Sequence, residues 1–119
     1  MSCEVEYTND FEDWWNSLNA EEQVSVDAYV QLLEQQCAQL RYPYCSGING
    51  SRHSHMRELR VQHQGKPYRV LYAFDPRRIA ILLAGGCKSG DGRWYDKFVP
   101  LADRLYDEHI DSLKRAGET

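Results

Sequence analysis

The sequence predicts a single domain of the α+β class, in which two N-terminal helices pack on a mainly antiparallel sheet of about four strands and a C-terminal helix follows. Two observations carry this prediction. Apolar residues recur at helical spacing in the first third of the chain, whereas residues 56–86 alternate or run continuously as strands do. A length of 119 residues suits one domain, residues 1–119.

The N-terminal segment predicts a short strand and a first helix. Apolar and polar side chains alternate at residues 3–8, which is the two-residue period of a strand. Apolar residues then recur at helical spacing over residues 11–18. Either Thr8 or Asn9 can cap the helix that this second pattern indicates.

The second predicted helix has the clearest pattern in the sequence. Asn19, with Glu22 three residues later, resembles a capping box at its start. One apolar stripe then consists of Val26, Val30, Leu33, Cys37 and Leu40. We therefore expect an amphipathic helix from about Ala20 to Leu40, with Cys37 as a core thiol.

Strand patterns begin after a segment without periodicity. Residues 41–54 are rich in turn formers, so they are expected to form a loop. Residues 56–64 and 67–74 alternate, and residues 79–86 form a nearly continuous apolar run that is typical of a central strand. Short turns join these three segments, which predicts an antiparallel meander. The N-terminal helices would cover one face of the sheet, and the other face can remain partly open.

The end of the sequence predicts a third helix with a looser pattern. Its apolar positions are Phe98, Leu101, Leu105, Ile110 and Leu113. Proline has no N–H group, so Pro100 suits the first turn of a helix better than its interior. The predicted helix therefore runs from about Val99 to Lys114.

The charge of the chain is unevenly distributed. Residues 1–51 carry nine acidic side chains and one basic side chain, whereas residues 52–104 carry eleven basic and five acidic ones. This asymmetry can mark a face that binds a polyanion, although a solvated mosaic of charges explains it equally well. Because no apolar run could span a membrane and no signal peptide is apparent, we expect a cytoplasmic protein without a membrane partner, with its four cysteines reduced.

The glycine-rich stretch AGGCKSGDGRW, residues 84–94, is open to several chemical interpretations. It lacks the outer glycine of a phosphate-binding Walker loop. A zinc site could form from His53, His55, Cys45 and Cys87, but their spacing matches no familiar ligand pattern. Cys87 could act as a nucleophile beside Lys88, although adjacent side chains at a strand end tend to point apart.

A fourth interpretation is metal-independent cleavage of RNA, which requires cations for the phosphoryl charge and groups that transfer protons. Arg60 and Arg69 occupy successive strands at positions where pairing could place both on one sheet face. Lys88, Arg93 and Tyr95 follow the third strand, at the edge of the same sheet. Solvated arginines are common on such faces, so these residues alone leave a purely structural role equally open.

Three consecutive motifs resemble the RelE/ParE superfamily of bacterial toxins, and within it the HigB-like branch. They are PYRVLYAFD at residues 67–75, ILLAGGCKSGDGRWY at residues 81–95 and VPLADRLYDEHI at residues 99–110. The likeness extends from about Val5 to Leu113. It implies a small RelE-like fold and a role as the toxin component of a type II toxin–antitoxin pair.

The resemblance also implies an activity. Such a toxin is a metal-independent endoribonuclease that cleaves mRNA, free or on the ribosome, by attack of the 2′-hydroxyl, and it needs no cofactor. On this basis, catalysis is assigned to Arg60, Arg69, Lys88 and Tyr95. We further expect Arg57, Arg93 and Lys97 to bind RNA, and His109 could supply a base for proton transfer. The implied protein partner is a cognate antitoxin, a helix-turn-helix DNA-binding protein.

Two alternatives to the ribonuclease remain. A ParE-like inhibitor of DNA gyrase would use the same fold without performing any chemistry. A degenerate toxin would act as a binding or regulatory module. Cys87 stands where the HigB-like branch usually has aspartate, and this substitution is the feature that keeps the second alternative open.

Overall fold

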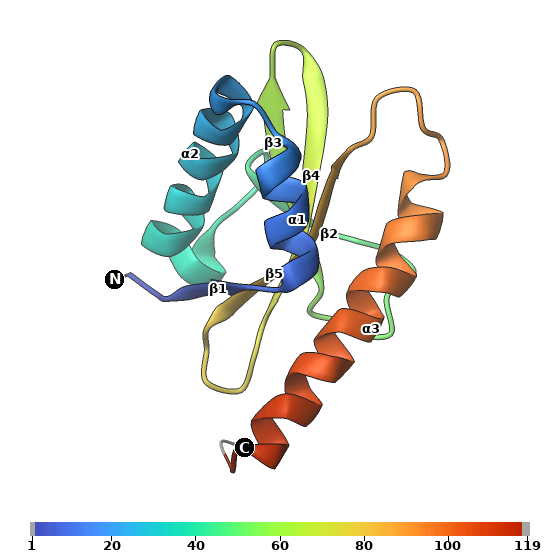
Figure 1. Cartoon of the computed structure of the whole chain (residues 1–119). Helices are drawn as coiled ribbons and strands as arrows, with labels where there is room; N and C mark the ends of the chain where they lie inside the picture. The colour runs from blue at the N-terminus through green and yellow to red at the C-terminus, as the bar shows by residue number, and fades with distance from the viewer. Residues whose placement is uncertain (1, 118–119) are drawn as a thin grey trace.

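The computed structural model describes residues 2–117 and consists of three layers (Figure 1). Helices α1 and α2 lie on one side of a five-stranded sheet, and α3 lies on the other. The elements in chain order are β1 (Val5–Tyr7), α1 (Asn9–Ser17), α2 (Ala20–Gln36), a 3-10 turn η1 (Cys37–Gln39), β2 (Cys45–Gly47), β3 (Arg57–His63), β4 (Lys66–Phe74), β5 (Ala80–Cys87) and α3 (Trp94–Arg115).

The sheet confirms the predicted meander and extends it at both edges. Its strand order is β1-β5-β4-β3-β2, and every neighbouring pair is antiparallel except β1 with β5. The first strand and both N-terminal helices also form as predicted. Strand β2 was not predicted, because its three residues, Cys45–Gly47, are too few to show an alternation and lie among turn formers.

The two sheet faces support separate apolar clusters. The face under α1 and α2 buries side chains that include Phe11, Val26, Leu33, Leu59, Val70 and Tyr72. The face under α3 buries Leu71, Ile81, Leu83, Trp94, Ala102 and Leu105. Helix α3 contacts β4 and β5, whereas on the same face of β3 Arg60 is half-buried and Gln62 is exposed. This arrangement agrees with the expectation of a partly open face.

The capping box of α2 is present, but the helix ends earlier than predicted. The Asn19 side chain accepts a hydrogen bond from the Glu22 backbone N–H at 2.8 Å, and the Glu22 carboxylate accepts one from the Asn19 N–H at 2.9 Å. At the other end, Cys37 has a positive φ of 55°, which ends the α-helix after Gln36. Cys37 is only half-buried, so the prediction of a core thiol was wrong.

Helix α3 begins at Trp94, earlier than the predicted start near Val99, and contains Pro100 in its interior. The reason is tertiary packing. Trp94 is 2% exposed, and its ring stacks on Phe98 with the centroids 4.4 Å apart, so burial of the first turn outweighs the helical hydrogen bond that proline removes. The earlier start is important for the site because it places Tyr95 on a rigid helix.

No helix within residues 2–117 combines the length and the apolar character needed to cross a bilayer.

Candidate active site

Two arginines face each other on the sheet surface that α3 partly covers. Strands β3 and β4 pair in a register that sets Arg60 directly opposite Arg69. Because side chains alternate along a strand, both point away from the α1–α2 face, where Leu59 and Val70 are buried. The prediction that pairing could place both arginines on one face is confirmed.

A buried glutamate lies at the centre of this surface. Glu58 is on β3, two positions from Arg60 and therefore on the same face, and it is 3% exposed. Its Oε1 accepts a hydrogen bond from the Tyr95 hydroxyl at 2.6 Å, and its Oε2 accepts one from the Ser46 hydroxyl at 2.8 Å. The Arg60 guanidinium donates to Oε2 at 3.3 Å. A carboxylate buried to this degree requires such partners, so the cluster fixes the Glu58 side chain in place.

Sequence reasoning missed Glu58 as a site residue. The available signal was its position: it lies on the Arg60 face of a strand whose opposite face is apolar. A carboxylate at such a position is expected to form ion pairs with the arginines on the same face. The residues that supply its hydroxyl partners are Ser46 and Tyr95, which are distant in sequence, so only the tertiary structure reveals the full set.

The two arginines differ in access to solvent. The Arg69 side chain is 5% exposed, whereas that of Arg60 is 28% exposed. Arg69 donates to the Tyr68 carbonyl at 3.0 Å, and its Nε lies 3.5 Å from Glu58 Oε1. This last contact is an ion pair without hydrogen-bond geometry, and Arg69 Nε has no hydrogen-bond partner within residues 2–117. Arg69 therefore forms an ion pair with Glu58 in the protein interior, whereas Arg60 is exposed enough to contact a ligand.

Tyr95 and Lys88 form the edge of the site. Burial, followed by the hydrogen bond to Glu58, raises the pKa of the Tyr95 phenol above its ordinary value, so the phenol stays protonated at neutral pH. The Lys88 ammonium lies 5.1 Å from the centroid of the Tyr95 ring, within cation–π range. The backbone N–H of Lys88 donates to the Pro67 carbonyl at 3.0 Å, which anchors the start of the loop to the sheet.

Comparison with known proteins identifies the family. The family model described as "Phage derived protein Gp49-like (DUF891)" matches residues 13–107. "Putative toxin HigB3" of Mycobacterium tuberculosis (strain ATCC 25618 / H37Rv) is 43% identical over 107 residues, which are 89% of this chain and 92% of that protein. This chain belongs to the Gp49-like family of HigB-like toxins.

A second relative and a solved structure agree with this membership. "Putative toxin HigB2" of the same M. tuberculosis strain is 41% identical over 99 residues, which are 82% of the HigB-like chain but only 49% of that relative. The chain thus spans about half the length of this relative. A mutant of the E. coli toxin RelE, solved in the free state, has a TM-score of 0.57 with 9% identity, and the match covers 95% of this chain and 99% of that one. At that identity the likeness shows the fold alone.

Arg57 lies on the opposite face of the sheet of this HigB-like protein from the other predicted site residues. Its neighbour across the sheet is Tyr72, and its guanidinium lies 3.4 Å from the Cys45 Sγ. The strand period explains this placement, because Arg57 and Arg60 differ by an odd number of positions. The structure thus separates Arg57 from Arg60, and its role in RNA binding stays a prediction.

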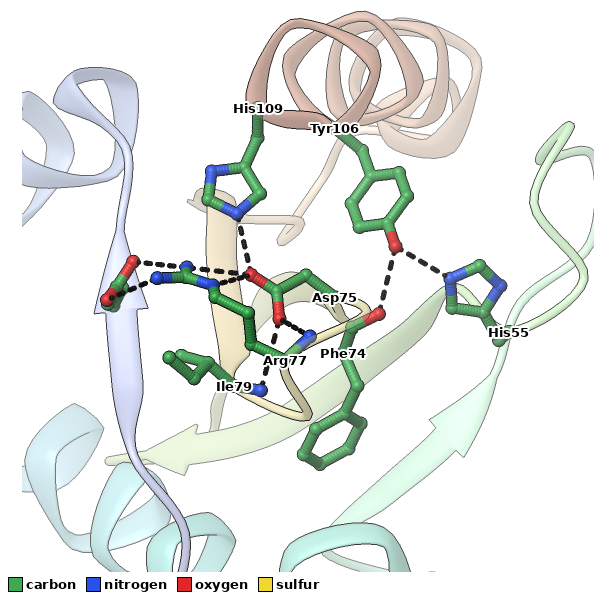
Figure 2. Close-up of polar contacts among 8 residues, drawn as sticks. His55, Phe74, Asp75, Arg77, Ile79, Tyr106 and His109 are labelled. Atoms are coloured by element: carbon green, nitrogen blue, oxygen red, sulfur yellow. Dashed lines mark hydrogen bonds and ion pairs between the residues drawn. The ribbon is translucent and has the colours of Figure 1, made fainter. Parts of the chain in front are cut away.

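His109 also lies apart from the predicted site. It is on α3, fourteen positions after Tyr95, which corresponds to about 21 Å along a helix with a rise of 1.5 Å per residue. Its Nε2 lies 2.8 Å from Asp75 Oδ2, in the turn between β4 and β5 (Figure 2). The long helix thus places it at the far end of the sheet from Tyr95, and its role in proton transfer stays a prediction.

Asp75 is the centre of a separate polar network (Figure 2). Its side chain is fully buried and accepts from His109, from the Arg77 guanidinium at 2.7 Å and from the backbone N–H groups of Arg77 and Ile79. Arg77 continues the network to Glu6 on β1 at 2.9 Å. Burial opposes ionisation of Asp75, but these donors outweigh it and lower its pKa below the ordinary value. The network joins α3, the β4–β5 turn and the edge strand.

The remaining predicted residues lie around the glycine-rich loop. Arg93 is exposed at the N-cap of α3. Lys97 is exposed and forms an ion pair with Asp91 at 3.4 Å. Cys87 is exposed at the end of β5. Arg93 and Lys97 are thus accessible on the same loop–helix segment as Tyr95, and their role in RNA binding stays a prediction.

The four residues of the zinc alternative do not converge. Within residues 2–117, no group of three or more His, Cys, Asp or Glu side chains is arranged to hold a metal ion. Cys45 is buried, and its thiol donates to the Leu40 carbonyl at 3.1 Å. His53 instead contacts Asp107 at 2.8 Å, and His55 contacts the Tyr106 hydroxyl at 3.2 Å. Both histidines therefore attach their loop to α3.

Proposed function

We propose that this HigB-like protein is the toxin of a type II toxin–antitoxin pair and a metal-independent endoribonuclease that cleaves mRNA. The observation that carries the proposal is the Tyr95–Glu58 hydrogen bond of 2.6 Å beside two accessible cations, Arg60 and Lys88. RNA supplies its own nucleophile, so the protein needs only to transfer protons and to stabilise the phosphoryl charge.

The Tyr95–Glu58 pair is suited to activate the 2′-hydroxyl. The Tyr95 hydroxyl donates a hydrogen bond to Glu58, which leaves the lone pairs of the phenol oxygen able to accept a hydrogen bond from the substrate. In the proposed step, the proton of the 2′-hydroxyl passes to the Tyr95 oxygen while the phenol proton passes to Glu58. Glu58 is 3% exposed and its Oε1 is occupied by the Tyr95 hydroxyl, so it acts as the base through Tyr95.

Lys88 is suited to assist the leaving group. The 2′-oxygen forms a bond to phosphorus, the bond between phosphorus and the 5′-oxygen breaks, and the Lys88 ammonium donates a proton to that 5′-oxygen. The products are a 2′,3′-cyclic phosphate and a 5′-hydroxyl end. Arg60 binds the non-bridging oxygens, where a single well-placed donor contributes roughly 10²- to 10³-fold in rate. Arg69 is a positioning residue, because it contacts Glu58 and lies below the surface.

The proposed partners follow from the same surface. The mRNA, free or on the ribosome, would cross the accessible part of the sheet between β3 and the start of α3. A cognate antitoxin, a helix-turn-helix DNA-binding protein, would cover this basic sheet and the glycine-rich loop. The acidic α1–α2 half would repel RNA from the opposite face.

Expression of the chain without an antitoxin tests the proposal. We expect growth arrest with new mRNA 5′ ends, and we expect both to disappear in the double variant Tyr95→Phe, Lys88→Gln. Arrest with DNA damage and intact mRNA would instead identify a gyrase inhibitor. A chain that is harmless when it is expressed and folded would identify a degenerate toxin. Cleavage of purified RNA in excess chelator tests metal independence separately.

A further inference from the structure

A pocket of about 510 Å³ opens directly beside the Tyr95–Glu58 pair. It is lined by Glu58, Arg60 and Tyr95, by Asp96 of α3, and by residues 46–50, which are the end of β2 and the start of the loop that follows it. The volume lies within the range of roughly 300 to 1,000 Å³ that is usual for small-molecule sites. A ligand group in this pocket would be adjacent to the reacting phosphate.

The exposed residue Tyr42 contacts Arg60, the cation that lines the pocket. The Arg60 guanidinium carbon lies 5.1 Å from the centroid of the Tyr42 ring. Tyr42 is 70% exposed, so most of its ring stays open to solvent beside Arg60. An arginine held against an aromatic ring has its planar guanidinium fixed in orientation, so its N–H groups are directed in advance toward the edge of a ligand.

The polar groups of the pocket select one kind of base. Arg60 can only donate hydrogen bonds, and the Asp96 carboxylate can only accept them. Asp96 is exposed at the pocket, and its carboxylate has no hydrogen-bond or ion-pair partner among residues 2–117. Guanine matches both groups, since O6 and N7 form an acceptor pair for an arginine and the opposite edge carries the N1–H and N2–H₂ donors for a carboxylate.

We propose that this pocket, with Tyr42 supporting Arg60, binds a guanine base that flanks the reacting phosphate of the RNA. The inference rests on the proposed ribonuclease function, because it assigns a base-binding subsite to the same surface. Arg60 would contact both the base and the phosphate, and Asp96 and Tyr42 would be the specificity-determining residues.

Binding of nucleotides tests the subsite without catalysis. The probes are GMP, AMP, CMP and UMP, titrated into the folded protein and followed by changes in amide chemical shifts. We expect GMP to bind roughly tenfold more tightly than the others, because one well-placed bidentate contact contributes about that factor or more. The largest shifts should fall on residues 46–50 and on Asp96. Equal affinity for all four nucleotides would overturn the proposal.

Two variants and a matched control measure what Asp96 and Tyr42 contribute to nucleotide binding. Asp96→Asn should remove most of the preference for GMP, and Tyr42→Leu should weaken binding of every nucleotide several-fold. Tyr44→Leu is the control, because Tyr44 is 45% exposed but its ring faces Tyr29 of α2 at 6.3 Å. Equal losses in the Tyr42 and Tyr44 variants would contradict the role of Tyr42, and thermal unfolding verifies that each variant is folded.

The cut sites in RNA separate this inference from the function on which it rests. Cleavage with guanine enriched next to the cut, and loss of that enrichment in Asp96→Asn, supports both. Cleavage without any guanine preference overturns the subsite and leaves the ribonuclease. Selective GMP binding by a protein that cuts no RNA supports the subsite and overturns the ribonuclease.

Discussion

Arg60 and Arg69 stand opposite each other on neighbouring strands, yet the side chain of Arg69 is 5% exposed and that of Arg60 is 28% exposed. Two identical side chains on paired strands therefore have different environments and different roles. Arg69 compensates the charge of buried Glu58, and Arg60 contacts Glu58 while remaining open to a ligand.

Replacement of the two arginines should separate stability from RNA binding. Arg69→Ala leaves Glu58 buried with one cation fewer, so we expect a loss of about 2–4 kcal/mol in the free energy of unfolding. Arg60→Ala should change that free energy by less than about 1 kcal/mol and weaken RNA binding roughly tenfold. Urea unfolding and RNA titration measure the two effects. Equal destabilisation by both substitutions would contradict the division of tasks.

Removal of the Tyr95 hydroxyl should slow cleavage strongly in a variant that still folds. Tyr95→Phe deletes the atom that links the substrate to Glu58, so we expect the rate of RNA cleavage to fall about 10²- to 10⁴-fold. Tyr106→Phe is the matched control, because Tyr106 lies on the same helix and donates to the Phe74 carbonyl at 2.9 Å, away from Glu58. Single-turnover kinetics of both variants would show whether the effect is specific to Tyr95.

Replacement of His109 should affect stability and leave activity intact. His109→Gln removes one of the donors to buried Asp75, while Arg77 and two backbone N–H groups remain. We expect the free energy of unfolding to fall by about 1–2 kcal/mol and the cleavage rate to stay within about twofold. A large loss of cleavage in a folded variant would restore His109 to a role in proton transfer.

The Asp75 network should make the free energy of unfolding depend on pH in the acidic range. The pKa of Asp75 is lowered in the folded protein, so its contribution is complete above the unfolded pKa of about 3.9 and is lost as the pH falls through the lower folded value. Asp75→Asn should therefore cost about 2–4 kcal/mol at pH 7, and progressively less below about pH 4. Urea unfolding of both proteins at pH 7, 5 and 3 measures this difference. A constant gap would contradict the ionised state of Asp75.

Two glycines near the loop should differ in their tolerance of alanine. A methyl group at Gly85 would overlap the Trp14 ring of α1, so Gly85→Ala should destabilise the protein by about 1–3 kcal/mol. No atom lies within 4 Å of the corresponding position at Gly92, so Gly92→Ala should change stability by less than about 0.5 kcal/mol. Thermal unfolding compares the two. Similar melting temperatures would show that α1 moves to accommodate the methyl group.

Local patterns predicted much of the sheet and one side of the site. The two-residue period of β3 and β4 assigned Arg60 and Arg69 to one face, and the structure confirms that they are paired. The same period places Arg57 on the opposite face of the sheet from Arg60. The capping box at Asn19 could also be predicted from the sequence, because its residues lie within one helical turn.

The sequence by itself determined the order of the main elements, the family and the face to which each strand side chain points, because these depend on neighbouring residues. Only the tertiary structure decided that Glu58 meets Ser46 and Tyr95, that α3 starts at Trp94, and that His109 belongs to Asp75. Each of these depends on how a distant segment packs on the sheet. Packing of Trp94 and Phe98 beside Gly86 fixes where α3 lies, and with it which of its polar side chains reach the site.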